Sequence, residues 1–194
     1  LRCLVGSEMC IRDRLYTMHD PKYNYLYETE PEPFMNNRKM FCPRGKMLGG
    51  SSSHNGMVHV RGNPMDFENW AQKDLKSWNY NNVLPYFKKS ESIEGLDETY
   101  RNKSGPLKLS RSSEGNELSK VYLEAAEQAG YEINNDMNGY KQEGFGLMDT
   151  TIYGGRRQST SVTYLHPVIN RRNLTVITNT IVNKVIIENN KAVG

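Results

Sequence analysis

The feature that most constrains this chain is a glycine- and serine-rich segment at residues 45–56, which reads GKMLGGSSSHNG. Adjacent glycines at Gly49 and Gly50 allow left-handed backbone and the close approach of a ligand to the main chain. The serines that follow can cap a helix, whose first turn presents free N–H groups and a positive dipole end. Such a turn suits a pyrophosphate or an electron-rich ring, although similar residues also occur in ordinary loops.

Two better-known phosphate-binding patterns are excluded for this segment. It lacks the Gly-Lys-Ser/Thr spacing of a P-loop, and it does not contain the dinucleotide fingerprint G-x-G-x-x-G. The segment therefore needs its sequence context before a ligand can be named.

Composition narrows the class of protein. The 194 residues are 37% hydrophobic and 10% aromatic, which favours a folded chain over a disordered tail. There is no apolar run of the ~20 residues that a membrane-spanning helix needs, and no clear secretory signal. A net charge of +3 with both signs interspersed argues against a nucleic-acid-binding surface. Three cysteines without metal or redox spacing indicate a reducing compartment and no metal site.

The pattern along the chain predicts a mixed α/β or α+β fold. Three prolines between residues 31 and 43 forbid a regular helix, so we expect residues 15–44 to be extended and loop-like. Helical patterns cover residues 66–73, with Asp66 as N-cap, and 82–92. The clearest helix is at 117–128, where apolar residues share one face and Gly130 closes the end, and residues 157–168 predict another that ends near Pro167.

Short strands are predicted in the second half of the chain. Residues 106–110 alternate like a strand, and residues 174–178 and 181–187 form two β-rich runs followed by a turn at 188–191. A further strand starts at 192–194 with nothing after it to pair with. Both ends of the chain thus resemble cut edges, and we expect an incomplete core.

The first fourteen residues resemble a translated sequencing adapter. Codons that contain a transposon mosaic end would encode Glu8 to Arg14, so we exclude residues 1–14 from the fold prediction. The alternative is a genuine N-terminal extension.

Residues 23–194 resemble the glucose–methanol–choline (GMC) flavoprotein oxidoreductases. The resemblance starts from GKMLGGSSSHNGMVHVRGNPMDFENWA and continues in order through LPYFKKSE, NGYKQEGFG, GRRQSTSVTYL and RRNLTVITNTIVNKVIIENNKAVG. The choline-oxidising bacterial subfamily fits best. The resemblance implies a partial GMC fold that holds the middle of the FAD-binding domain and part of the substrate domain.

The resemblance also implies which residues line the cofactor. It places Met47, Gly49, Gly50 and Ser51 against FAD, and Asn55, Gly56, Met57 and Val58 beside the isoalloxazine ring. Val182 matches a position whose backbone contacts the adenine, and it can equally be a buried strand residue.

His54 departs from the usual family pattern, which has an aliphatic residue there. It aligns with the histidine through which some family members bind FAD covalently. A neutral imidazole nitrogen is a competent nucleophile, so the alternatives are a histidyl-flavin and a packed histidine beside a non-covalent FAD. His59, a second departure, is predicted to be structural.

Other candidate residues receive structural interpretations. Arg156 and Arg157 resemble a phosphate clamp, but a solvated helix start explains them equally well. Trp70 and Trp78 are expected in the core rather than in a cation-binding cage.

The expected activity is FAD-dependent oxidation of an alcohol to an aldehyde, with choline as the favoured substrate. The alternatives are another GMC alcohol dehydrogenase or oxidase, for aryl, alkyl or polyethylene-glycol alcohols, and a non-enzymatic flavin-binding module. The family's catalytic base lies beyond Gly194, so no catalytic residue is expected here and the chain alone should be inactive. Oxygen or a quinone would accept the electrons. The protein itself is expected in the cytoplasm or peripheral to a bacterial inner membrane.

The resemblance divides the chain into three segments. Residues 15–110 and 156–194 would belong to the FAD-binding domain, and residues 111–155 to the substrate domain.

Overall fold

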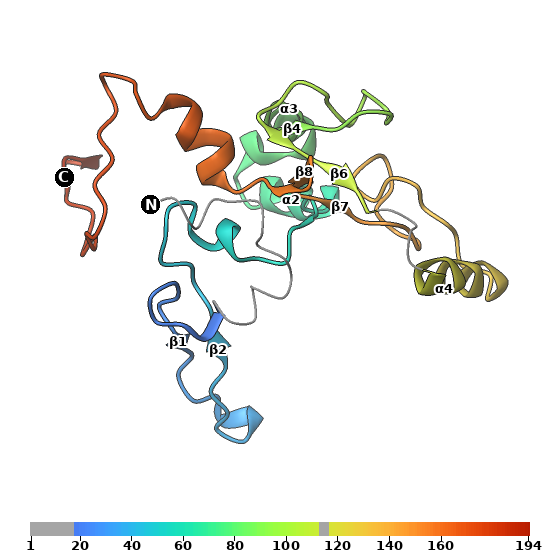
Figure 1. Ribbon diagram of the computed structural model, residues 1–194, viewed down its shortest axis with the longest axis horizontal. Helices are drawn as coiled ribbons and strands as arrows, with labels where there is room; N and C mark the ends of the chain where they lie inside the picture. The colour runs from blue at the N-terminus through green and yellow to red at the C-terminus, as the bar shows by residue number, and fades with distance from the viewer. Residues whose placement is uncertain (1–17, 113–116) are drawn as a thin grey trace.

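The computed structural model describes residues 18–112 and 117–194. The segment interpreted as adapter lies outside the described residues. Within the described residues, short strands alternate with the α-helices α2, α3 and α4 and with several tight helical turns, and long connections join them (Figure 1). The mixed fold class predicted from the sequence is confirmed.

The proline-rich N-terminal segment forms a projecting hairpin. Strand β1 (Tyr27–Glu28) pairs antiparallel with β2 (Phe41–Cys42), and a 3₁₀ turn, η1 (Pro33–Met35), lies between them. Figure 1 shows this hairpin, in blue, extending away from the rest of the chain. The prediction of an extended segment is confirmed. The pairing of β1 with β2 was not predicted, because the prolines indicated only a loop.

The centre of the molecule is a three-stranded sheet. Strand β3 (Val58–His59) and strand β6 (Ser110–Arg111) both pair antiparallel with β7 (Asp149–Thr150), so β7 is the middle strand. Strand β4 (Glu91–Ser92) pairs in parallel with β5 (Leu107–Lys108) beside it. The strand predicted at 106–110 is therefore present as two short pieces.

Two helices pack on this sheet region. Helix α2 (Pro64–Gln72) begins at Asn63, whose side chain accepts the N–H of Met65, so Asn63 and not Asp66 is the N-cap. The 3₁₀ turn η3 (Lys76–Trp78) leads into α3 (Tyr80–Ser90). Phe67 of α2 is buried against the rings of Trp70, Tyr80 and Phe87.

The tryptophan prediction was wrong in one respect. Trp70 and Trp78 contact each other edge to face at 5.8 Å, but they remain 45% and 49% exposed. They sit at the rim of the aromatic cluster because Phe67, which is smaller, fills its centre.

Helix α4 (Glu117–Gln128) has the predicted bounds, and Gly130 follows it with a φ of +82°. The apolar face expected to pack on a core is largely exposed, since Leu118, Val121 and Tyr122 are 59–75% accessible. In Figure 1 α4 lies at the edge of the molecule.

The C-terminal quarter departs most from prediction. A second hairpin, β8 (Ile152–Tyr153) with β9 (Arg156–Arg157), precedes a π-helical turn, η4 (Ser161–Leu165), and a 3₁₀ turn, η5 (His166–Val168). The helix predicted at 157–168 is thus shorter and irregular, and it ends close to Pro167 as expected.

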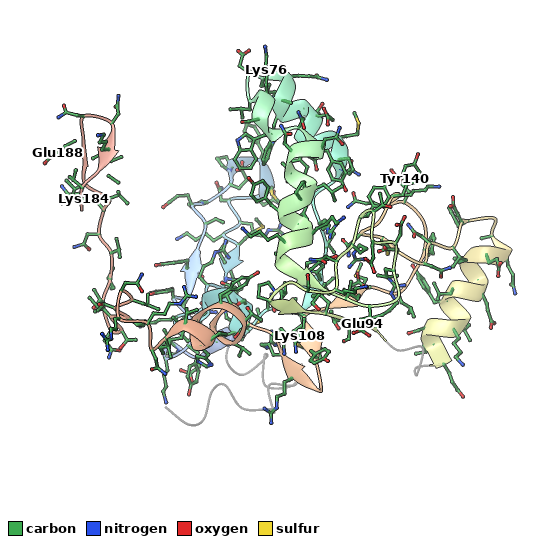
Figure 2. The ribbon with its side chains drawn as sticks, turned by 90° about the horizontal axis from the view of Figure 1, so that it is seen from above. Lys76, Glu94, Lys108, Tyr140, Lys184 and Glu188 are labelled. Carbon is green, nitrogen blue, oxygen red and sulfur yellow. The ribbon has the colours of Figure 1, made fainter. Side chains whose placement is uncertain are left out.

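The β-rich runs at 174–178 and 181–187 form no strand apart from Ile187, because no neighbouring strand within the described residues pairs with them. Strand β10 (Ile187–Glu188) pairs instead with β11 (Lys191–Ala192) across Asn189 and Asn190, both left-handed. The last strand was predicted to have nothing after it to pair with, and its partner is the strand that precedes it in the chain. Figure 2 shows Lys184 and Glu188 far out along this arm.

Candidate cofactor-binding site

The glycine–serine loop, defined as residues 45–56, is a compact turn rather than the start of a long helix. Gly49 has a φ of +87° and caps a four-residue 3₁₀ turn, η2 (Gly50–Ser53). Ser53 Oγ donates to the carbonyl of Leu48 at 2.9 Å, and Gly45 N–H donates to Ser51 Oγ at 3.2 Å. The serines predicted to cap a helix thus close the loop upon itself.

The glycines of this loop face different surroundings. A Cβ at Gly49 would collide with Ser53 Oγ and lie 3.2 Å from Cβ of Ser161, so this position is enclosed by protein. A Cβ at Gly50 would meet no atom of the described residues within 4 Å, and Gly50 has a φ of +54°. Gly50 N–H donates to the carbonyl of Met47 at 2.9 Å, so the residue is open to a ligand only on the side where a side chain would project.

The loop leads into a strained residue. Met57 is buried and has a φ of +62°, an unusual conformation for a residue with a side chain. Its N–H donates to Asn55 Oδ1 at 3.1 Å, and its carbonyl accepts from the N–H of Thr151 at 2.7 Å. Val58, which follows, is 49% exposed. The segment predicted to lie beside a flavin ring is thus fixed at its backbone on both sides of Met57.

A segment about a hundred residues further along the chain clamps the loop. Ser52 Oγ accepts from the N–H of Thr160 at 2.9 Å, and the Thr160 hydroxyl donates to the carbonyl of Gly49 at 3.2 Å. Arg157 Nη1 donates to the carbonyl and side-chain oxygens of Asn55 at 2.9 and 2.8 Å and to the carbonyl of Ser52 at 3.3 Å. Arg157 therefore holds backbone, a role that neither sequence interpretation foresaw.

His54 lies inside the loop. Its side chain is 4% exposed, and a Cβ on Gly45 would lie 2.8 Å from its ring, so a side chain at position 45 would displace it. Its Nε2 atom is buried by protein. A covalent bond from this nitrogen to a flavin would require the loop to open.

The remaining predicted site residues divide into two groups. Met47, Ser51 and Gly56 lie in or beside the loop, and Ser51 is exposed. Val182 is 80% exposed on the C-terminal arm. The structure thus gathers the predicted residues from Met47 to Val58 and leaves Val182 apart from them.

A buried ion-pair cluster forms around Glu91 and includes His59, on the strand that follows the loop. The sequence pattern did not predict this cluster. Glu91 is fully buried, and its carboxylate contacts Arg61 Nη2 at 2.7 Å, Arg101 Nε at 2.8 Å and His59 Nε2 at 3.4 Å. Burial would raise the pKa of Glu91, but hydrogen bonds from His59 and Arg101 and the charges of both arginines lower it to about 2. His59 is therefore structural, as predicted.

The same cluster joins the strands of the sheet. Arg101 Nη2 donates to Asp149 Oδ2 at 2.8 Å, and Arg101 also pairs with Asp136. Asn138 Nδ2 bridges Asp149 Oδ2 and the carbonyl of His59, both at 3.1 Å. Because His59 and Asp149 are opposite each other in β3 and β7, the cluster fixes the strand that continues from Met57.

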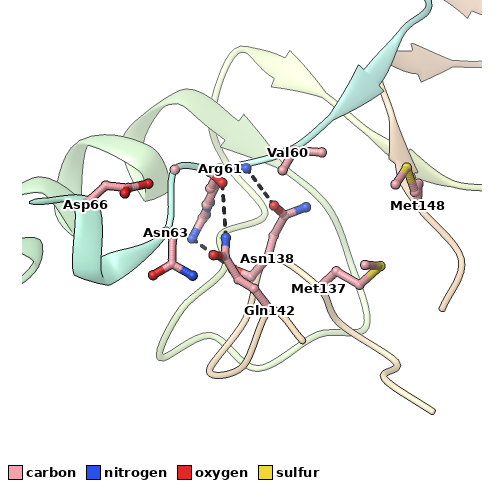
Figure 3. Close-up of a pocket in the computed structure, with 9 residues that line it drawn as sticks. Val60, Arg61, Asn63, Asp66, Met137, Asn138, Gln142 and Met148 are labelled. Atoms are coloured by element: carbon pink, nitrogen blue, oxygen red, sulfur yellow. Dashed lines mark hydrogen bonds between the residues drawn. The ribbon is translucent and has the colours of Figure 1, made fainter. Parts of the chain in front are cut away.

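A cavity of about 310 Å³ lies beside Arg61 and is lined also by Asn138 and Gln142 (Figure 3). Asn138 accepts the N–H of Arg61 at 2.8 Å through Oδ1, and Gln142 donates to the Arg61 carbonyl at 3.0 Å. Met137 and Met148 supply apolar walls. The cavity includes none of the predicted cofactor residues.

Within residues 18–112 and 117–194, no group of three or more His, Cys, Asp or Glu side chains is placed to hold a metal ion. No helix in the described part of the chain is both long and apolar enough to cross a membrane.

Solved structures of similar shape identify the class of fold. Pyridoxine 4-oxidase from Mesorbium loti superposes with a TM-score of 0.80 and 28% identity, over 88% of this chain and 34% of that chain. A variant of formate oxidase from Aspergillus oryzae, studied for modification of its FAD, gives a TM-score of 0.71 and 25% identity over 86% of this chain and 30% of that one. The fold is that of an oxidoreductase of the FAD-binding type.

Sequence comparison then gives the family. The model of the family described as GMC oxidoreductase matches residues 5–194, so this chain belongs to the GMC oxidoreductase family. Choline dehydrogenase from mouse mitochondria is 46% identical over 90% of this chain and 29% of its own length. Oxygen-dependent choline dehydrogenase from Sinorhizobium fredii is 47% identical over 89% of this chain and 31% of its own length. The chain spans about a third of the length of such relatives.

Proposed function

We propose that this chain supplies the central part of the FAD site of an alcohol oxidoreductase. The observation that carries the proposal is the open side of Gly50, in a loop whose conformation is held by its own serines and by the 157–160 clamp. An adenine dinucleotide fits this feature, because its pyrophosphate and rings can approach the main chain closely where no side chain intervenes. Membership of the GMC family supports the same cofactor.

The proposal gives each part of the loop a task. Gly50 and Ser51 present accessible backbone to the cofactor, and the exposed Asn55 and Val58 flank the ring. Met47, Gly49 and Gly56 shape the loop behind them. When bound, FAD would accept a hydride from the alcohol carbon, while the protein supplies binding, orientation and electrostatics.

Val182 remains a proposed contact to the adenine. Its exposure of 80% leaves its backbone accessible, and its place on an unpaired β-rich run supports a role that is completed by further strands. We also propose the division of the chain into FAD-binding segments at 15–110 and 156–194 and a substrate-domain segment at 111–155.

Choline is the proposed substrate, and betaine aldehyde the product. The names of the relatives at 46–47% identity support this choice, and the bacterial names also support oxygen as electron acceptor over a quinone. We propose a cytoplasmic location for the protein or a peripheral one at the inner membrane. The catalytic base is proposed to lie outside this chain, which would be inactive alone.

The proposal is tested on the protein encoded by the gene when it is read past both ends of this chain. Purified protein is precipitated with acid, and flavin is measured in pellet and supernatant. Oxygen uptake is then recorded with choline, an aryl alcohol, an alkyl alcohol and pyridoxine. Flavin in the supernatant and uptake with choline are expected. Absence of flavin from both fractions would overturn the proposed function.

The attachment of FAD is decided by the same precipitation with His54→Gln. The burial of His54 Nε2 supports non-covalent FAD with His54 as a packing residue. Flavin that stays with the pellet in the parent protein and is released in His54→Gln would establish the histidyl link instead.

A further inference from the structure

We propose that Arg157 is a positioning residue for the flavin, and that it acts through Asn55 on the backbone of Met57. This inference rests on the proposed function, since it concerns the same site. It assigns a task to a residue that lies a hundred positions from the loop it serves.

Three hydrogen bonds from Arg157 converge on one end of the loop. A single nitrogen, Nη1, reaches three oxygens: Asn55 Oδ1 at 2.8 Å, the Asn55 carbonyl at 2.9 Å and the Ser52 carbonyl at 3.3 Å. Bonds from a charged donor are stronger than neutral ones. The guanidinium therefore fixes both the backbone and the side chain of Asn55.

Asn55 passes this constraint to Met57. The same Oδ1 atom that accepts from Arg157 also accepts the N–H of Met57 at 3.1 Å. Met57 holds a left-handed backbone that only a surrounding structure can maintain in a residue with a side chain. Release of Arg157 would free Asn55, and Met57 would then relax toward an ordinary conformation. The peptide groups on either side of Met57 would turn with it.

The neighbouring arginine provides a matched control. Arg156 is exposed, and within the part of the chain that the structure describes its side chain makes no hydrogen bond or ion pair. Arg156→Met thus removes the same charge from an adjacent position without touching the loop.

The test compares Arg157→Met, Arg157→Lys and Arg156→Met in the whole flavin-loaded protein. The readouts are the FAD dissociation constant, the absorption spectrum of bound flavin, and KM and kcat for choline per bound flavin. For Arg157→Met we expect FAD binding weaker by at least about tenfold and a lower kcat per bound flavin, with KM changed less than kcat. In Arg157→Lys, part of the FAD affinity and part of kcat should be retained. The three hydrogen bonds of Arg157 come from a single nitrogen, and the lysine nitrogen lies only one bond nearer the backbone.

A double-mutant cycle tests the route through Asn55 and remains informative if Arg157→Met does not fold. Arg157→Lys should lower kcat per bound flavin in the parent protein but change it less than twofold in the Asn55→Ala background. Equal effects in both backgrounds, or an Arg157→Met protein that matches Arg156→Met in affinity, spectrum and kcat, would overturn the inference. A parent protein that binds no FAD would instead overturn the proposed function, and this inference with it.

Discussion

At the scale of single residues, the charge of Glu91 decides how the loop is supported. A carboxylate with no exposed surface is unfavourable unless several donors surround it, and Arg61, Arg101 and His59 do so. Removal of the negative charge takes the ion-pair partner from the buried guanidinium of Arg61 and one of the three carboxylates from that of Arg101. Glu91 is therefore expected to contribute more to the stability of the fold than its place in the polar sequence KKSESIEG indicates.

Glu91→Gln should lower the free energy of unfolding of the whole protein by about 3–5 kcal/mol, because it breaks a buried ion pair. The control is Glu98→Gln, which removes an exposed pair with Lys103 at 2.7 Å and should change the free energy of unfolding far less, because solvent screens this pair. Urea unfolding measures both variants. Similar midpoints for the two would show that the buried cluster contributes no more than a surface pair.

Stability should also depend on pH through Glu91. Its pKa is about 2 in the folded state and near 4.5 when unfolded, so its stabilising contribution is complete above pH 4.5. The contribution is lost as the pH falls from 4.5 toward 2. Urea midpoints measured between pH 6 and pH 3 should therefore fall more steeply in the parent than in Glu91→Gln. Parallel slopes would contradict the assignment of that pH dependence to Glu91.

At the scale of elements, alanine substitutions at the two adjacent glycines of the loop are predicted to have different effects on stability and on FAD binding. Gly49→Ala introduces a Cβ that collides with Ser53, in addition to the cost of a left-handed alanine, about 1–2 kcal/mol. Gly50→Ala carries only the second cost, because its Cβ points into open space. We expect Gly49→Ala to lower the melting temperature more, and Gly50→Ala to weaken FAD binding more than its stability loss accounts for. Thermal unfolding and FAD titration of both variants test this, and the reverse order would contradict it.

The elements also show what a sequence can predict. Helix 117–128 follows from its periodicity and from Gly130, and both signals are local. The β-rich runs at 174–187 carry equally strong local signals, yet they remain mostly unpaired, because a strand is stable only beside another strand. The positions of α2, α3 and α4 were predicted to within two residues at each end, whereas pairings between distant residues were not predicted.

The candidate site follows the same rule. The glycine–serine loop could be singled out from the sequence because its predicted cofactor residues are consecutive. Arg157 and Thr160 were not assigned to it, because no local pattern connects them with residues a hundred positions earlier. Glu91 was missed since a glutamate among lysines and serines reads as a solvated surface residue.

At the scale of the whole molecule, the chain exposes much more surface than a compact domain of its mass. Its accessible area is 14835 Å², against about 9,400 Å² expected for a compact monomer of 22.3 kDa. The C-terminal arm contributes apolar surface to this area, since Ile177, Ile181 and Val185 are all more than 60% exposed.

We predict that trypsin cuts the isolated 194-residue chain first after Lys184, on the exposed arm, and cuts slowly at the buried Arg61 and Arg101. In the whole protein the arm should be protected, because further strands would cover its apolar residues. Mass spectrometry of early fragments distinguishes the two. Equal cleavage at Lys184 in both proteins would contradict the proposed completion of this arm.

The clamp of residues 157–160 on the loop has a consequence for the order of events during synthesis. Asn55 leaves the ribosome about a hundred residues before its partner Arg157, and translation proceeds at about 5–20 residues per second. For a period on the order of ten seconds, the nascent loop therefore lacks the hydrogen bonds from Arg157 to Asn55 that help to hold the left-handed backbone of Met57. A nascent chain stalled between these residues should accordingly have an unformed loop, whereas one stalled well after Thr160 can close it.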